Sequence, residues 1–206
     1  MVGDGMKALH KDFWMEIRKS KARFISIFLI VALGVAFFSG IQASSPDMRY
    51  SGDAYYEAAK LMDLKIQGTL GLTQRDVKAV SDIDGVELAE GGYSTDVMSG
   101  EDDARKVLHL ESISSNFNLL TADEGRIPEK SGEIFLDKPF AKNRGYKIGD
   151  TISVSEDGDS ELLKKTTYTV VGIGSSPLYI SFNRGNTTLG SGEVSGFGYI
   201  LPEDFD

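Results

Sequence analysis

The sequence predicts an α+β extracytoplasmic domain carried on one N-terminal transmembrane helix, and three observations lead to this fold class. Residues 24–41 form a run of eighteen residues without charge or proline. Residues 63–98 place one helical stripe between two segments of alternating polarity, as in a β-α-β unit. Residues 105–201 contain short alternating segments separated by Gly and Asp turns. We therefore expect a mixed α/β domain with a β-α-β subdomain and a smaller β-rich subdomain.

The uncharged run is long enough to cross a bilayer. Eighteen helical residues extend about 27 Å at about 1.5 Å per residue, close to the roughly 30 Å hydrocarbon core. Twelve of them are Phe, Ile, Leu or Val, which together favour insertion by about 4–7 kcal/mol. The sequence therefore predicts a transmembrane helix over residues 24–43.

Charge on either side of this run predicts its orientation. Residues 1–23 carry six Lys/Arg against three acids, whereas residues 44–206 carry sixteen Lys/Arg against twenty-eight acids. The basic residues nearest to the run are Arg18, Lys19, Lys21 and Arg23. Because basic flanks stay in the cytoplasm, we expect a protein of the cell membrane with a cytoplasmic N-terminus and an extracytoplasmic acidic domain.

Two other interpretations of the run stay open. A cleaved signal peptide also joins a basic start to an apolar run, but that run usually has about 7–15 residues and ends at an A-x-A-like site. The best match here, Ile41-Gln42-Ala43, has the wrong first residue. The other interpretation is a buried helix of a soluble protein, which rarely stays uncharged for so long. A lipid anchor on Cys is excluded, because the chain has no Cys.

Small residues recur every fourth position within the run, at Ala32, Ala36 and Gly40. Such a face allows two membrane helices to pack closely, so these residues are a candidate helix-packing face. The other explanation is that Ala and Gly are simply common in membrane spans.

The segment before the run has the spacing of an amphipathic helix. Leu9, Phe13, Trp14 and Ile17 fall on one side, with Lys and Arg elsewhere around the helix. We expect residues 1–23 to lie on the inner membrane surface, anchored by Phe13, Trp14 and Ile17. Docking on a cytoplasmic partner is the alternative.

After the run, residues 44–62 are expected to form an extracytoplasmic helical stalk. Pro46 suits the first turn of a new helix after Ser45, and apolar residues continue at helical spacing to about Met62, with Gly52 loosening the helix. The extracytoplasmic domain is then expected to occupy residues 63–206.

Within the domain, the β-α-β unit is expected at strand 64–67, a helix capped by Thr73 and Asp76, and strand 86–89, continued at 93–98. Further strands are expected at residues 105–114, 133–136, 151–155 and 166–173. A helix should open at Asp137 and Pro139 and end near Gly145, and Asp157-Gly158 should form a hairpin tip. Residues 119–120 and 125–128 are expected to form an irregular link without a strand, and the Gly-rich residues 185–198 to be a flexible connection.

Sequence motifs give no support for an enzyme, a cofactor or a metal site. His10 and His109 fall on opposite sides of the expected membrane, and His109 suits a half-buried position on a strand. Calcium binding at residues 157–161 is a weak alternative to a hairpin, because the EF-hand spacing is absent. The sequence contains no P-loop and no G-x-S-x-G elbow, and the acidic composition argues against nucleic acid. The acidic residues 101–103 suit a solvated loop.

Three stretches carry a family resemblance: RKSKARFISIFLIVALGVAFFSGI, GRIPEKSGEIFLDKPFAKNRGYKIGDTISV and TVVGIGSSPLYISFNRGNTTLGSGEVSGFGYILPEDF. In their order the chain resembles the N-terminal part of MacB/FtsX-type ABC transporter permeases, over nearly all of residues 7–206. The resemblance implies a MacB-like extracytoplasmic domain after the first span. It also implies three later spans, a cytoplasmic ABC ATPase subunit as partner, and contact with a second permease copy or with the remaining spans.

The sequence stops at Asp206, so we expect it to be the first portion of such a permease. The resemblance implies a non-catalytic role in which movement driven by the ATPase is coupled to the outer domain. The alternative is a single-pass, membrane-anchored binding or sensor module.

Overall fold

The computed structural model describes residues 3–100, 105–156, 162–181 and 183–206. The chain divides into two compact units, Met1–Tyr55 and Tyr56–Asp206. The first unit holds helix α1 (Gly3–Lys19) and most of helix α2 (Lys21–Ala58). The calcium alternative at residues 157–161, the hairpin tip expected there and the acidic residues 101–103 lie outside the described residues.

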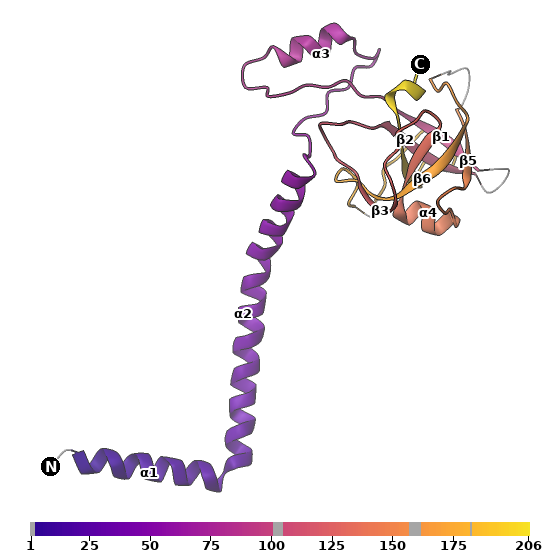
Figure 1. Ribbon diagram of the computed structural model, residues 1–206. Helices are drawn as coiled ribbons and strands as arrows, with labels where there is room; N and C mark the ends of the chain where they lie inside the picture. Colours follow the sequence, from indigo (N-terminus) through magenta and orange to yellow (C-terminus); the bar gives the residue numbers. More distant parts are fainter. Residues whose placement is uncertain (1–2, 101–104, 157–161, 182) are drawn as a thin grey trace. The chain divides into compact units, whose positions relative to one another are not determined.

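Helix α2 is a single helix of 38 residues with Pro46 inside it (Figure 1). The expectation that Pro46 opens a new helix was therefore wrong. Proline removes one backbone donor, which leaves the Gln42 carbonyl without its helical partner. No residue of α2 is buried, so solvent can satisfy that carbonyl, and the helix continues past it.

The second unit confirms the α+β class. Its helices are α3 (Gln74–Ser81), α4 (Lys138–Arg144) and the short 3-10 helix η2 (Pro202–Asp204). Its strands are β1 (Ser94–Ser99), β2 (Lys106–Ser112), β3 (Thr121–Gly125), β4 (Glu133–Asp137), β5 (Thr151–Ser155), β6 (Thr167–Ser175) and β7 (Gly196–Ile200).

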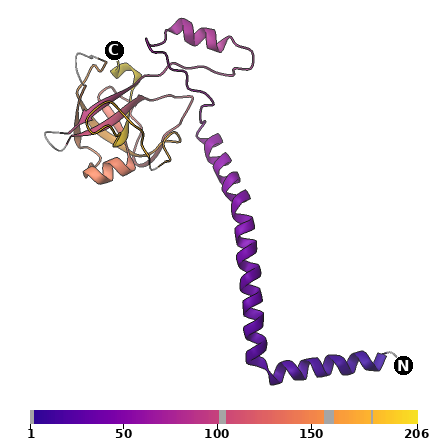
Figure 2. The ribbon, with the colours of Figure 1, turned by 180° about the vertical axis from the view of Figure 1, so that it is seen from behind.

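The strands form one sheet in the order β3-β6-β4-β7-β2-β1-β5, and β5 also pairs with β6. That last pairing closes β6, β4, β7, β2, β1 and β5 into a ring. Figure 2 shows this unit from behind. One edge of β6 is shared, because residues 167–169 pair with β5 and residues 172–175 pair with β3. The sheet thus becomes a small barrel with β3 added at its side.

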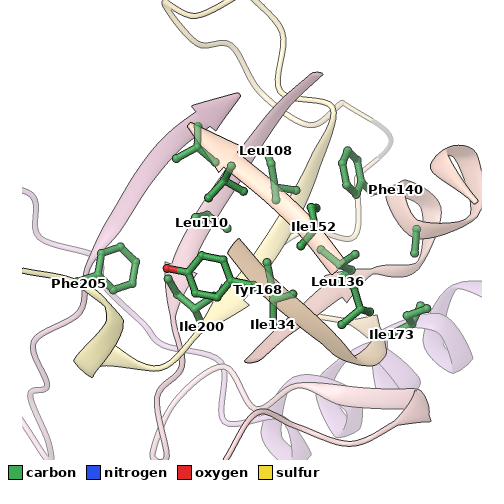
Figure 3. Packing of buried hydrophobic residues seen from close by; sticks show 14 residues of the cluster. Leu108, Leu110, Ile134, Leu136, Phe140, Ile152, Tyr168, Ile173, Ile200 and Phe205 are labelled. Atoms are coloured by element: carbon green, nitrogen blue, oxygen red, sulfur yellow. The ribbon is translucent and has the colours of Figure 1, made fainter. Parts of the chain in front are cut away.

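Apolar side chains fill the interior of this barrel. Leu108 and Leu110 of β2, Ile134 and Leu136 of β4, and Ile152 of β5 are fully buried and belong to one cluster (Figure 3). Phe140 and Ala141 of α4 join the same cluster. Barrels with few strands are filled by side chains rather than by solvent, so this unit has its own core.

A second apolar cluster is formed by Phe135, Val194, Phe197 and Tyr199. Phe135 packs against β6 at Gly172 and Gly174, which have no side chains. A Cβ at Gly172 would lie 2.6 Å from the Phe135 ring and 2.1 Å from the Arg126 carbonyl oxygen. These glycines therefore allow the close packing of Phe135 against β6.

Two predicted strands did not form. Residues 64–67 and 86–89 have no strand pairing, although α3 lies between them with the predicted cap, in which the Thr73 N–H donates to Asp76 Oδ2 at 2.7 Å. A strand requires a neighbour for its backbone groups, and the described residues supply none to these segments. Alternating polarity therefore overpredicted strands here, and the helix of the expected β-α-β unit has no flanking pair of strands.

Two other predictions about the domain were wrong. Residues 121–125 form strand β3, whose polar, exposed residues carry no alternation. The expected flexible connection at residues 185–198 ends in β7, a buried strand between β4 and β2. Gly196 and Gly198 are needed there, because a Cβ would lie 2.4 Å from Phe140 and 2.8 Å from Leu110. Glycine thus indicated close packing rather than flexibility.

Candidate functional site

Helix α2 extends well beyond the thickness of a membrane. Its 38 residues span about 57 Å at about 1.5 Å per residue, roughly twice the hydrocarbon core. Among the described residues it is the one helix long and apolar enough to cross a membrane. The part of α2 that follows the apolar run, residues 42–58, continues the same helix without interruption.

The predicted membrane-facing residues lie on α1 and α2. Ala32, Ala36 and Gly40 are four residues apart on one helix and so share a face, where a Cβ at Gly40 would meet no atom within 4 Å. On α1, Phe13 and Trp14 are 61% and 63% exposed and Ile17 is half-buried. The basic residues fall at the break between the helices: Arg18 and Lys19 in the last turn of α1, Lys21 and Arg23 in the first turn of α2.

The C-terminal end of α2 has the geometry of a Schellman motif. The Leu61 N–H donates to the Tyr56 carbonyl at 3.0 Å, and the Lys60 N–H donates to the Glu57 carbonyl at 3.1 Å. Lys60 has a φ of 49°, in the left-handed region where glycine is usual. A non-glycine residue in this conformation is strained, so neighbouring contacts must hold it.

Those contacts come from residues 118 and 119, just before β3. The Asn118 N–H donates to the Lys60 carbonyl at 3.0 Å, and the Leu119 N–H donates to the Ala59 carbonyl at 2.8 Å. The Asn118 side chain then accepts from the Met62 N–H at 3.1 Å. We call residues 56–62 with residues 118–119 the junction. It ties the residues that end α2 to the segment before β3, within the second unit, through three hydrogen bonds.

A polar cluster lies on the outer face of β2, around the carboxylate of Glu111. Glu111 Oε1 accepts from Lys65 Nζ at 2.8 Å and from the Tyr179 hydroxyl at 2.9 Å. It also lies 3.6 Å from His109 Nε2. Burial opposes ionisation of Glu111, but these donors outweigh burial and lower its pKa to about 2. Glu111 is therefore a buried anion shared by three partners.

His109 bridges two carboxylates from neighbouring strands. Its Nδ1 lies 2.5 Å from Asp96 Oδ1 on β1, and its Nε2 faces Glu111. Burial disfavours the charged ring, but Glu111 and Asp96 outweigh burial and raise the pKa of His109. His109 is half-buried on a strand, as predicted, but the sequence did not predict its partners.

The loop after β6 closes over this cluster. The Tyr179 ring stacks on Phe197 of β7 with centroids 3.5 Å apart, and His109 meets Tyr179 edge-on at 6.2 Å. Farther along the loop, Arg184 lies over the Phe197 ring and forms a 3.2 Å ion pair with Asp137. The loop is thus held at two points, Tyr179 and Arg184.

Sequence reasoning missed both the junction and the polar cluster. In the cluster, His109 and Glu111 of β2 contact Lys65, Asp96 and Tyr179, which are far apart in the sequence. One signal was present: His109 and Glu111 are two residues apart in an alternating segment, which places both on the same face of a strand. Two titratable residues on one half-buried face required partners that the sequence alone could not identify.

Comparison with known families identifies this arrangement. Residues 24–202 match the MacB-like periplasmic core domain. The chain belongs to this family. The match includes the apolar part of α2, the junction and the barrel, so the chain is the MacB-like periplasmic domain of an ABC transporter permease.

Two solved structures are similar to parts of this chain. The extracellular domain of the noncanonic ABC-type transporter YknZ from Gram-positive bacteria has 13% identity and a TM-score of 0.43, covering 70% of this chain and 71% of that one. The periplasmic region of MacB from Actinobacillus actinomycetemcomitans has 13% identity and a TM-score of 0.38, covering 68% of this chain and 57% of that one. No curated protein matches the chain.

Proposed function

We propose that this chain is the N-terminal portion of an ABC transporter permease subunit that couples movement driven by a cytoplasmic ATPase to its extracytoplasmic domain. Family membership supports the permease assignment. The observation that supports coupling is the continuous helix α2, which reaches from the apolar run to the junction without a break. A stiff helix can transmit a displacement, whereas a flexible linker would absorb it.

The junction is the point at which such a displacement would enter the outer domain. Ala59 is buried, and the backbone of residues 59 and 60 is hydrogen-bonded to residues 118 and 119. Residues 121–125 follow directly as β3, which pairs with the shared strand β6. Movement at the end of α2 would therefore act on the barrel through a short, hydrogen-bonded path.

The proposal includes a topology and a set of partners. The basic residues at the break between α1 and α2 favour a cytoplasmic N-terminus, with the acidic domain outside the cell membrane. Phe13, Trp14 and Ile17 would anchor α1 at the inner surface. The face of Ala32, Ala36 and Gly40 would pack against a second permease copy or the remaining spans of the permease.

Co-purification with the ATPase tests this function. The permease is expressed at full length from its own gene, extracted in a mild detergent and purified by a tag. Recovery of an ABC ATPase subunit in stoichiometric amount is the expected result. A permease that comes down alone under conditions that preserve its fold would contradict the proposal.

The same preparation tests the route through the junction. In the Asn118→Ala variant, the Met62 N–H loses the side-chain oxygen to which it donates. Ala must also adopt the left-handed φ of 51° at position 118, which it favours less than Asn does. We expect the ATPase still to bind but its nucleotide state to affect the outer domain less. Asn143→Ala, at an exposed position on α4, is the matched control.

The alternative function is a single-pass, membrane-anchored binding or sensor module. Such a module would purify without an ATPase and would bind its partner through the acidic outer domain.

A further inference from the structure

The polar cluster around Glu111 holds together parts of the outer domain that are distant in the sequence. Lys65 comes from the segment between α2 and α3, Asp96 from β1, His109 and Glu111 from β2, and Tyr179 from the loop after β6. Glu111 is 7% exposed, so its charge depends on these partners rather than on solvent. A change in the charge or position of one partner therefore alters the interactions of Glu111 with the other partners.

Charge in the cluster is balanced when His109 is protonated. Lys65 and His109 then supply two positive charges against the carboxylates of Asp96 and Glu111. The protonated ring carries a proton on both nitrogens, so it can donate to Asp96 through Nδ1 and present a proton to Glu111 through Nε2. Phe197, which packs edge-on against the ring at 6.0 Å, brings no charge, and the nearby Arg184 is neutralised by Asp137.

Loss of one proton from His109 disturbs this arrangement in either tautomer. If the remaining proton stays on Nδ1, the lone pair of Nε2 faces the Glu111 carboxylate, 3.6 Å away. If it stays on Nε2, the lone pair of Nδ1 faces Asp96, 2.5 Å away. In both cases the cluster has one excess negative charge in a buried site, which is unfavourable.

We infer that His109, Asp96 and Glu111 form a proton-dependent clamp that holds the loop at Tyr179 closed on β2 and β7 and loosens when His109 becomes neutral. Tyr179 is the element that responds, because its hydroxyl donates to Glu111 and its ring contacts His109. The clamp would make the outer face of the domain sensitive to the pH outside the cell. It would act in this chain whether or not an ATPase binds.

The direction of the pH effect follows from the raised pKa of His109. The clamp is fully formed below the ordinary His pKa of about 6.5 and is lost as the pH rises through the higher pKa of the folded state. Glu111, with a pKa of about 2, stays ionised throughout this range. The pKa of Tyr179 is raised by burial and by Glu111, so its hydroxyl remains a donor.

Spin labelling of the full chain in lipid nanodiscs tests the clamp. Because the chain has no Cys, Ile180→Cys gives one label next to Tyr179, at a side chain that is 65% exposed. From about pH 5 to about pH 9 the spectrum should shift from an immobile to a mobile form. A label at the exposed Lys142 position on α4 should show no shift. A pH-independent spectrum at Ile180 would overturn the inference.

Two further measurements assign the transition to His109. In the His109→Gln variant the label at Ile180 should show no transition with pH, and a transition that survives would overturn the inference. In the His10→Gln background, His109 is the one remaining His, and its NMR titration reports its pKa directly in the otherwise unchanged domain. Its midpoint should coincide with the midpoint of the label's shift, and a clear difference between them would contradict the clamp.

Discussion

Replacing Phe135 by Ala is expected to lower the free energy of unfolding of the outer domain by about 3–5 kcal/mol. Phe135 is fully buried on β4 and meets Tyr199 edge-on, with ring centroids 6.1 Å apart. On its other side lie Gly172 and Gly174, which have no side chains to move into the space that the ring vacates. The cavity therefore persists, which places the cost at the upper end of the range for such substitutions.

Denaturant unfolding followed by circular dichroism, in detergent, measures this loss. Single domains are typically stable by about 5–15 kcal/mol, so a loss of this size removes a large share of the total. Phe13→Ala is the matched control, because Phe13 is 61% exposed on α1 and lies in the other unit. Equal midpoints for the two variants would show that Phe135 does not support the barrel as described.

Replacing Leu33 by Arg is expected to release the chain from the membrane. Leu33 lies near the middle of the apolar part of α2 and is 69% exposed, as expected of a side chain that faces lipid. Exchanging Leu for Arg at the centre of a span costs about 3–4 kcal/mol on the insertion scale. The whole run favours insertion by about 4–7 kcal/mol, so one substitution removes most of that preference.

Alkaline extraction of membranes measures the effect of Leu33→Arg. Wild-type chain should stay in the pellet, and the variant should move largely to the supernatant. Leu64→Arg makes the same exchange at a position that is 83% exposed in the outer unit, and it should stay in the pellet. If Leu33→Arg were retained as firmly as wild type, α2 would not be the membrane anchor.

The sequence predicted those elements whose side chains alternate or whose ends carry a cap. Strands β5 and β6 have this alternation. Helix α4 begins at Asp137, which accepts from the Phe140 N–H, and ends at Gly145 with a φ of 77°. These signals are local, so one sequence suffices to read them. The uncharged run within α2 is a local signal of the same kind.

The elements that were missed depend on distant parts of the chain. Strand β7 contains Gly196 and Gly198, whose need for space is set by Phe140 and Leu110 on other elements. Strand β3 has an exposed, polar sequence and exists because β6 offers an edge to it. The pattern at residues 64–67 and 86–89 was suitable for strands, but no described strand lies beside them. Pairing, rather than pattern, decided each case.

The candidate site shows the same limit. The anchor residues of α1 and α2 could be named from spacing and charge alone. The junction could not, because it depends on Lys60 and Asn118 adopting left-handed conformations that neither residue type requires. The clamp needed the fold to bring Lys65 and Tyr179 to the same carboxylate on β2.

The topology of the chain is the claim on which the proposed function most depends, and single-cysteine labelling measures it directly. Lys142→Cys on α4 and Lys11→Cys on α1 place one thiol in each unit of a chain that otherwise has none, both at exposed positions. A membrane-impermeant maleimide added to intact cells should label the Lys142→Cys chain at once, and the Lys11→Cys chain only after the membrane is permeabilised. Labelling of Lys11→Cys in intact cells, with Lys142→Cys protected until lysis, would contradict the account.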